Sequence, residues 1–173
     1  KNNQIGIVTH KLNPKNIKIA QREALMWGTI QQDAINFGNI LHEIMAFIHT
    51  KEDVDLAIQK ATELGLITFS QHQIFKETIA KIVNHEELIP FFDADAKVFN
   101  EQNIIKKAFK NIKPDRVVVK DNMAYLLDYK TGEKHNKHKA QLEEYELALQ
   151  EMKYTVAKKA LIYIGESIEI VTL

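Results

Sequence analysis

The spacing of apolar residues along the chain changes near residue 96. Before this point apolar side chains recur every three or four positions, most clearly from Gly38 to His49, and this spacing predicts amphipathic helices. Residues 1–20 are polar and predict a loose lead-in. The helices predicted in this part cover residues 20–34, 38–49, 52–64 and 71–83, with a short turn over 85–89 after them.

Capping residues support two of these helices. Thr50 and Asp53 have the spacing of a capping box, and Gly65 stands where a left-handed residue ends the same helix. Ser70 opens the next helix in the same way, and Pro90 closes the turn after it. The first 95 residues therefore predict a mainly helical scaffold.

Beyond residue 96, β-branched and apolar runs predict strands. A helix predicted over residues 140–152 stands between two strands, and this order predicts a right-handed crossover that joins parallel strands. The predicted strands cover residues 96–105, 116–120, 123–130, 157–164 and 168–173. The predicted fold class is α/β, with one domain over residues 1–173: a helical portion over 1–95 and a mixed central sheet flanked by helices over 96–173.

One predicted hairpin brings two acidic residues together. Asp121-Asn122 is a plausible two-residue turn, because both residue types tolerate positive φ. In that register Asp115 lies directly opposite Asp128, with Cβ atoms about 5 Å apart. Two carboxylates at that distance repel each other, so a cation should lie between them. Lys130 is near, and a divalent ion such as Mg²⁺ is the stronger candidate because hard cations prefer oxygen ligands.

The same strand ends on Asp128-Tyr129-Lys130. Side chains alternate along a strand, so Asp128 and Lys130 share one face and Tyr129 points to the other. An acid and a lysine so placed are commonly a solvated salt bridge without further function. The acid across the hairpin is what favours chemistry at this strand end, and a one-residue slip of the register would remove it.

Composition narrows the class of protein. The chain has 173 residues, a formal net charge of zero and no cysteine. Disulfides, a cysteine-ligated zinc site and an iron–sulfur cluster are therefore excluded, and an intracellular, cytoplasmic location is expected. Apolar runs stay well below the roughly 18 residues of a membrane span. Because the chain begins with Lys1, we expect it to be a fragment of a longer protein.

Other candidate site residues lie on the predicted helices. His42 lies roughly 130° from the centre of the apolar arc of its helix, which indicates either a surface histidine or one that reaches a cleft. Gln141 and Tyr145 are four residues apart and share a helix face, either in the core or at a site. Two basic stretches flank the hairpin and are either solvated loops or phosphate-binding surfaces: Lys106, Lys107, Lys110, Lys134, Lys137 and Lys139.

Taken together and in order, these residues resemble the RecB-like branch of the PD-(D/E)XK nuclease superfamily. The most telling part is Asp-Tyr-Lys-Thr-Gly after an Asp-Arg-Val strand, and the variant looks most like the C-terminal nuclease domains of bacterial AddA/RecB-type helicase–nucleases. Many members have Gly-x-Ile/Val before the Asp-Arg pair, where this chain has Ile112-Lys113-Pro114. The resemblance rests on Gly38-x-x-x-His42-Glu43, Glu101, Pro114-Asp115-Arg116-Val117, Leu127-Asp128-Tyr129-Lys130-Thr131-Gly132 and Gln141-x-x-x-Tyr145.

The resemblance implies a restriction-endonuclease-like core and a metal-dependent deoxyribonuclease. Asp115, Asp128, His42 and the backbone carbonyl of Tyr129 would ligate Mg²⁺ or Mn²⁺. Lys130 would orient or deprotonate the attacking water, or stabilise charge in the transition state.

The resemblance also implies supporting roles. Glu101 would serve a second ion or the water, and Gln141 and Tyr145 would contact DNA and support the site. The expected DNA-binding residues are Lys134, Lys137, Lys139 and Arg116.

The expected function is cleavage of DNA, with exonuclease action, in end processing and recombinational repair. Expected partners are DNA, the helicase portion of the same polypeptide and a partner subunit, with no membrane. One alternative is a non-cleaving DNA-binding module that retains the nuclease fold, although the acid-acid-lysine set is intact. A stand-alone restriction-type endonuclease is another, disfavoured by the Gln141/Tyr145 motif.

Overall fold

The structure is a computed structural model that describes residues 30–105, 111–165 and 167–173. Its centre is a five-stranded mixed sheet with the order β1-β4-β5-β6-β7, in which β5 and β6 are parallel and the other neighbours antiparallel. The strands are β1 (Lys97–Asn100), β4 (Arg116–Lys120), β5 (Met123–Thr131), β6 (Thr155–Ile164) and β7 (Ile168–Thr172). A separate two-stranded ladder joins β2 (Ile104–Ile105) and β3 (Asn111–Ile112).

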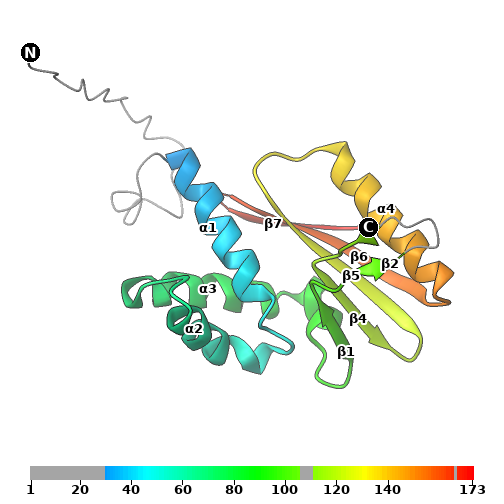
Figure 1. Ribbon diagram of the computed structural model, residues 1–173, viewed down its shortest axis with the longest axis horizontal. Coiled ribbons are helices and arrows are strands. Elements are labelled where there is room, and N and C mark those ends of the chain that lie inside the picture. Colours follow the sequence, from blue (N-terminus) through cyan, green and yellow to red (C-terminus); the bar gives the residue numbers. More distant parts are fainter. Residues whose placement is uncertain (1–29, 106–110, 166) are drawn as a thin grey trace, which may run out of the picture.

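Helices cover both faces of this sheet, with α4 on one side and α2 and α3 on the other (Figure 1). The α-helices are α1 (Ile30–Met45), α2 (Val54–Glu63), α3 (His72–Val83) and α4 (Asn136–Glu151). Three 3-10 helices precede or follow them: η2 (Lys51–Asp53), η3 (Phe69–Gln71) and η4 (Glu86–Phe92). The α/β class, the mixed sheet and the flanking helices are thus confirmed.

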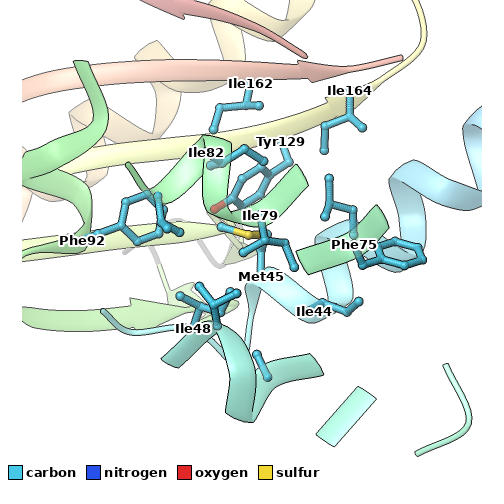
Figure 2. Packing of buried hydrophobic residues seen from close by; sticks show 14 of the residues in the cluster. Ile44, Met45, Ile48, Phe75, Ile79, Ile82, Phe92, Tyr129, Ile162 and Ile164 are labelled. Carbon is cyan, nitrogen blue, oxygen red and sulfur yellow. The ribbon is translucent and has the colours of Figure 1, made fainter. Parts of the chain in front are cut away.

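The apolar core lies in two layers because side chains of the central strands alternate between the two faces. Leu127 and Tyr129 of β5 pack with α1, α2, α3 and η4. Leu126 of the same strand packs with Leu142 and Leu149 of α4. Figure 2 shows the first layer, where α1 and α3 supply Ile44 and Phe75 against the sheet.

Several predicted boundaries differ from the structure. The described part of α1 already begins at Ile30, well before Gly38, because the helix continues through this glycine. The strand predicted over 96–105 is broken at Glu101, which has a φ of 54°. Helix α4 begins at Asn136, four residues before the predicted start, since lysine is a good helix former and extends the helix into the basic stretch.

Three sequence predictions fall wholly or largely outside the described residues, the first being the loose lead-in over residues 1–20. The helix predicted over residues 20–34 lies mostly there, and so does the basic loop carrying Lys106, Lys107 and Lys110. Among the residues that are described, none of the helices combines the length and the apolar character that crossing a membrane requires.

Candidate metal centre

Three potential metal ligands from distant parts of the chain meet at one end of the sheet. His42 comes from the last turn of α1, Glu101 follows β1, and Asp115 precedes β4. The Nε2 atom of His42 lies 2.9 Å from Oε1 of Glu101 and 3.0 Å from Oδ1 of Asp115. One ligand atom from each of the three residues lies within 4.8 Å of the others.

The hairpin that carries the acidic residues has the predicted register. Asp121 and Asn122 form its turn with φ values of 49° and 65°, and the residues flanking this turn pair directly with each other. The ladder runs to Arg116 opposite Leu127, one step before Asp115 and Asp128. The backbone N–H of Tyr129 donates a 2.7 Å hydrogen bond to Oδ2 of Asp115, which holds this carboxylate beside the end of β5.

Asp128 is the most deeply buried acid of the site, with 1% of its side chain exposed. Burial, together with the nearby charge of Asp115, raises the pKa of Asp128 to about 7, although the ion pair with Lys130 acts in the opposite direction. Its Oδ1 atom accepts no hydrogen bond from any described residue. A buried carboxylate oxygen without a donor is unusual, and such an oxygen is available to a bound cation.

The histidine and Asp115 stabilise each other's charged forms. The hydrogen bond to Asp115 raises the pKa of His42 despite the opposing effect of burial. Burial alone would raise the pKa of Asp115, but the hydrogen bond and the charge of His42, with the N–H of Tyr129, hold it below its usual value. Negative charge therefore concentrates at Asp115, where a cation would bind.

Glu101 enters the site through an uncommon backbone conformation. Its φ of 54° is rare for a residue with a side chain, and its N–H donates a 2.9 Å hydrogen bond to the carbonyl of Asp115. The other carboxylate oxygen, Oε2, forms an ion pair with Lys113, which raises the pKa of that lysine. Left-handed backbone of this kind is often found at functional sites.

His42, Asp115, Asp128 and Lys130 line a pocket of about 240 Å³. On its α4 side the amide of Gln141 donates a 2.5 Å hydrogen bond to the hydroxyl of Tyr145, which in turn donates to the carbonyl of Lys113 at 3.3 Å. Tyr145 lines this pocket and is also buried in the core, so its position agrees with both interpretations drawn from the sequence, a core residue and a site residue. The pocket is lined by Asn39, His42, Lys113, Asp115, Asp128, Tyr129, Lys130, Thr131, Gln141 and Tyr145.

The donor set fits a hard divalent cation. One potential ligand atom from each of two carboxylates and one imidazole lies within 4.8 Å of the others, and Asp128 adds a buried oxygen without a donor. Oxygen-rich sites of this kind suit Mg²⁺ or Mn²⁺. The side chain of Tyr129 points into the apolar layer instead (Figure 2), so only its backbone carbonyl remains a candidate ligand.

One predicted DNA-binding residue is wrong. Arg116 is 1% exposed, and its guanidinium donates hydrogen bonds to buried oxygens, so it does not lie where DNA could contact it. An arginine after an aspartate in a strand points to the opposite face from that aspartate, and here this face is the protein interior.

The predicted lysines lie in exposed positions. Lys137 and Lys139 are exposed in the first turn of α4, and Lys134 is exposed but paired with Glu169. Sequence reasoning did not single out Lys113 or Asn39 as site residues. The departure of Ile112-Lys113-Pro114 from the family pattern was the available signal for Lys113.

Comparison with known proteins gives no family assignment. No protein-family model matches the chain, and no curated protein matches its sequence. The family resemblance therefore stays a prediction that rests on the motifs.

Proposed function

We propose that this chain is a metal-dependent nuclease that hydrolyses phosphodiester bonds in DNA, with a restriction-endonuclease-like core. The observation that carries the proposal is the meeting of His42, Glu101 and Asp115 at the end of the hairpin that bears Asp128 and Lys130. These five residues come from four separate segments, and all five belong to the set that the sequence motifs select.

The charges of the site support a hydrolytic role. Asp115 and Asp128 line the pocket and Glu101 pairs with His42, and such a group of carboxylates repels an anionic substrate unless a cation is bound. His42, Glu101 and Asp115, with Asp128, would hold Mg²⁺ or Mn²⁺. When bound, the ion would lower the pKa of a water molecule and offset charge on the scissile phosphate.

The remaining groups would act on the substrate through fixed charges and hydrogen bonds. Lys130 is largely buried beside Asp128, so its ammonium is held where it would orient the attacking water or stabilise negative charge on the phosphate. Gln141 and Tyr145 form the opposite wall and would position the DNA backbone. The exposed lysines at the start of α4 would add salt-sensitive contacts without sequence preference.

Cleavage of linear and circular DNA with Mg²⁺, with Mn²⁺ and with EDTA tests this proposal. Asp128→Ala should remove cleavage, because it deletes the buried acid of the pocket, and the protein should stay folded. Asp93→Ala is the matched control, since Asp93 also pairs with a lysine of the sheet, Lys120, at the other end of β4. Faster cutting of linear DNA would support exonuclease action.

The outcomes separate the alternatives. Equal cleavage by wild type and Asp128→Ala would refute the site assignment. DNA binding without cleavage, and without any heat of Mn²⁺ binding in calorimetry, would favour the non-cleaving module. A role beside a helicase portion of the same polypeptide belongs to the proposal as well, and addition of that portion should then raise the cleavage rate.

A further inference from the structure

Arg116 has an unusual place for a charged residue. Its guanidinium is buried, yet its partners are backbone carbonyls and the amide oxygen of Asn100 rather than carboxylates. Nε donates to the carbonyl of Phe91 at 2.8 Å, while Nη1 and Nη2 donate to the carbonyls of Ile48 and His49 at 2.6 Å and 2.5 Å. The ring of Phe92 lies 4.4 Å from the guanidinium carbon. The planar guanidinium thus donates hydrogen bonds from all three of its nitrogen atoms at once.

Asn100 completes the same network from the neighbouring strand. It lies directly opposite Arg116 in the ladder between β1 and β4. Its Nδ2 donates to the carbonyls of Ala46 and Ile48, both at 3.0 Å, and its Oδ1 accepts a hydrogen bond from Nη1 of Arg116 at 3.0 Å. The carbonyls at the end of α1 have few helical partners, and they carry the partial negative charge that such donors stabilise.

Each of these two residues is the direct neighbour of a candidate ligand. Asn100 precedes Glu101, and Arg116 follows Asp115. Both donate hydrogen bonds to backbone carbonyls just after α1, the helix whose last turn carries His42. The three ligands therefore belong to three segments that are tied together close to each ligand, at the adjacent residue for Glu101 and Asp115 and four to seven residues after His42.

We propose that Asn100 and Arg116 are positioning residues for the metal centre, an inference that rests on the proposed function. By tying β1 and β4 to the carbonyls that follow α1, they set the separation between His42, Glu101 and Asp115. They also keep the left-handed turn at Glu101 that aims its carboxylate at His42. Because Arg116 uses carbonyl acceptors, it leaves the carboxylates free for the cation.

Precise separation matters for this kind of site. A metal centre needs its ligands held within about 0.5 Å of the working geometry, and loss of an outer partner typically weakens metal binding 10–100-fold. A purely structural role would instead change the stability of the protein and leave the metal affinity of the folded form unaltered.

Asn100→Ala tests the inference because Asn100 is only partly buried, so the variant should fold. Its matched control is Asn84→Ala, which also removes an asparagine amide donating to a helix carbonyl, that of Ala80 at 2.8 Å, away from the site. Calorimetric titration of the folded proteins with Mn²⁺ should show about 10-fold weaker binding for Asn100→Ala and unchanged binding for Asn84→Ala. Unchanged binding in both would overturn the inference.

A second readout needs no metal. The N–H of Glu101 donates to the carbonyl of Asp115, so its hydrogen exchange reports on the turn that aims this ligand. In metal-free Asn100→Ala this amide should exchange at least 10-fold faster, while amides in α3 keep their wild-type rates. If wild type binds no Mn²⁺, the proposed function fails, and unchanged exchange at Glu101 would separately overturn the positioning role. Arg116→Lys, where it folds, should weaken Mn²⁺ binding in the same way, because lysine cannot reproduce the fork.

Discussion

Gly38 offers a sharp test of how α1 is seated on the sheet. It lies one helical turn before His42, and a Cβ atom added there would stand 2.2 Å from Cγ2 and 3.3 Å from Cβ of Thr131 at the end of β5. Carbon atoms pack at about 3.5–4.0 Å, so the Thr131 methyl would have to move by more than 1 Å. The close approach of the helix to the strand therefore depends on the missing side chain.

The magnitude follows from two opposing effects of Gly38→Ala. Overpacking costs about 1–3 kcal/mol, whereas alanine in a helix interior is favoured over glycine by about 1 kcal/mol. We expect a net destabilisation of about 1 kcal/mol in the wild-type background. Thr131→Ser removes the clashing methyl and leaves only the contact of 3.3 Å, which a shift of a few tenths of an ångström relieves. In that background Gly38→Ala should be neutral or stabilising.

Urea denaturation of the four proteins in EDTA measures this coupling, expected at about 1–2 kcal/mol. Manganese titration of the same set adds a functional readout, because a displaced α1 moves His42 away from its acidic partners. Weaker binding in Gly38→Ala should recover in the double variant. An equal effect of Gly38→Ala in both backgrounds would refute the close-packing explanation, since rotation of Thr131 would then have relieved the contact.

Three further changes have expected outcomes of different kinds. Lys130→Ala should reduce the cleavage rate with little change in Mn²⁺ affinity, and equal loss of both in kinetics and calorimetry would make Lys130 structural. His42→Ala should lower Mn²⁺ affinity, and an unchanged titration would make it a surface histidine. Asp53→Ala should cost about 1 kcal/mol at pH 7, because Asp53 accepts the N–H of Thr50 at 2.7 Å. That bond lowers the pKa of Asp53 in the folded protein below its usual value of 3.8. The ionised side chain therefore stabilises the protein above pH 3.8, and this stabilisation is lost as the pH falls through the lowered pKa. Urea denaturation over this range should show the free energies of unfolding of wild type and Asp53→Ala becoming equal as the pH falls.

Local sequence signals predicted much of the fold and the hairpin register on which the site depends. The turn at Asp121-Asn122 follows from the tolerance of these residue types for positive φ, and it fixes the register that brings Asp115 beside the end of β5. Thr50 and Asp53 marked the start of the helical segment that continues into α2, and Gly65, which has a φ of 72°, marked its end for the same local reason. Such features depend on a few neighbouring residues and can therefore be inferred without tertiary contacts.

Features that depend on distant segments were not predictable in this way. The break in the predicted strand at Glu101 is stabilised by a hydrogen bond to Asp115, fourteen residues later in the chain, and no local sequence motif predicts it. Arg116 was expected to bind DNA, which requires exposure, whereas it is buried because backbone carbonyls of Ile48, just after α1, and Phe91, in η4, accept its hydrogen bonds. Likewise, the angle of His42 on its helix indicated exposure or a cleft, and only the packing of α1 decides between them.

Among the strands that the structure describes, β7 lies at an edge of the sheet, and this position has a consequence for the behaviour of the protein in solution. An edge strand presents unpaired N–H and C=O groups, and β7 combines Ile168, Ile170 and Val171 with a single charged residue, Glu169. A hollow of about 990 Å³ beside Ile168 and Ile170 leaves this edge approachable. With a pI near 7.2 the molecules also lack mutual repulsion at neutral pH. Concentrated samples should therefore self-associate most readily near pH 7, and a lysine in place of Thr172 should keep them dispersed.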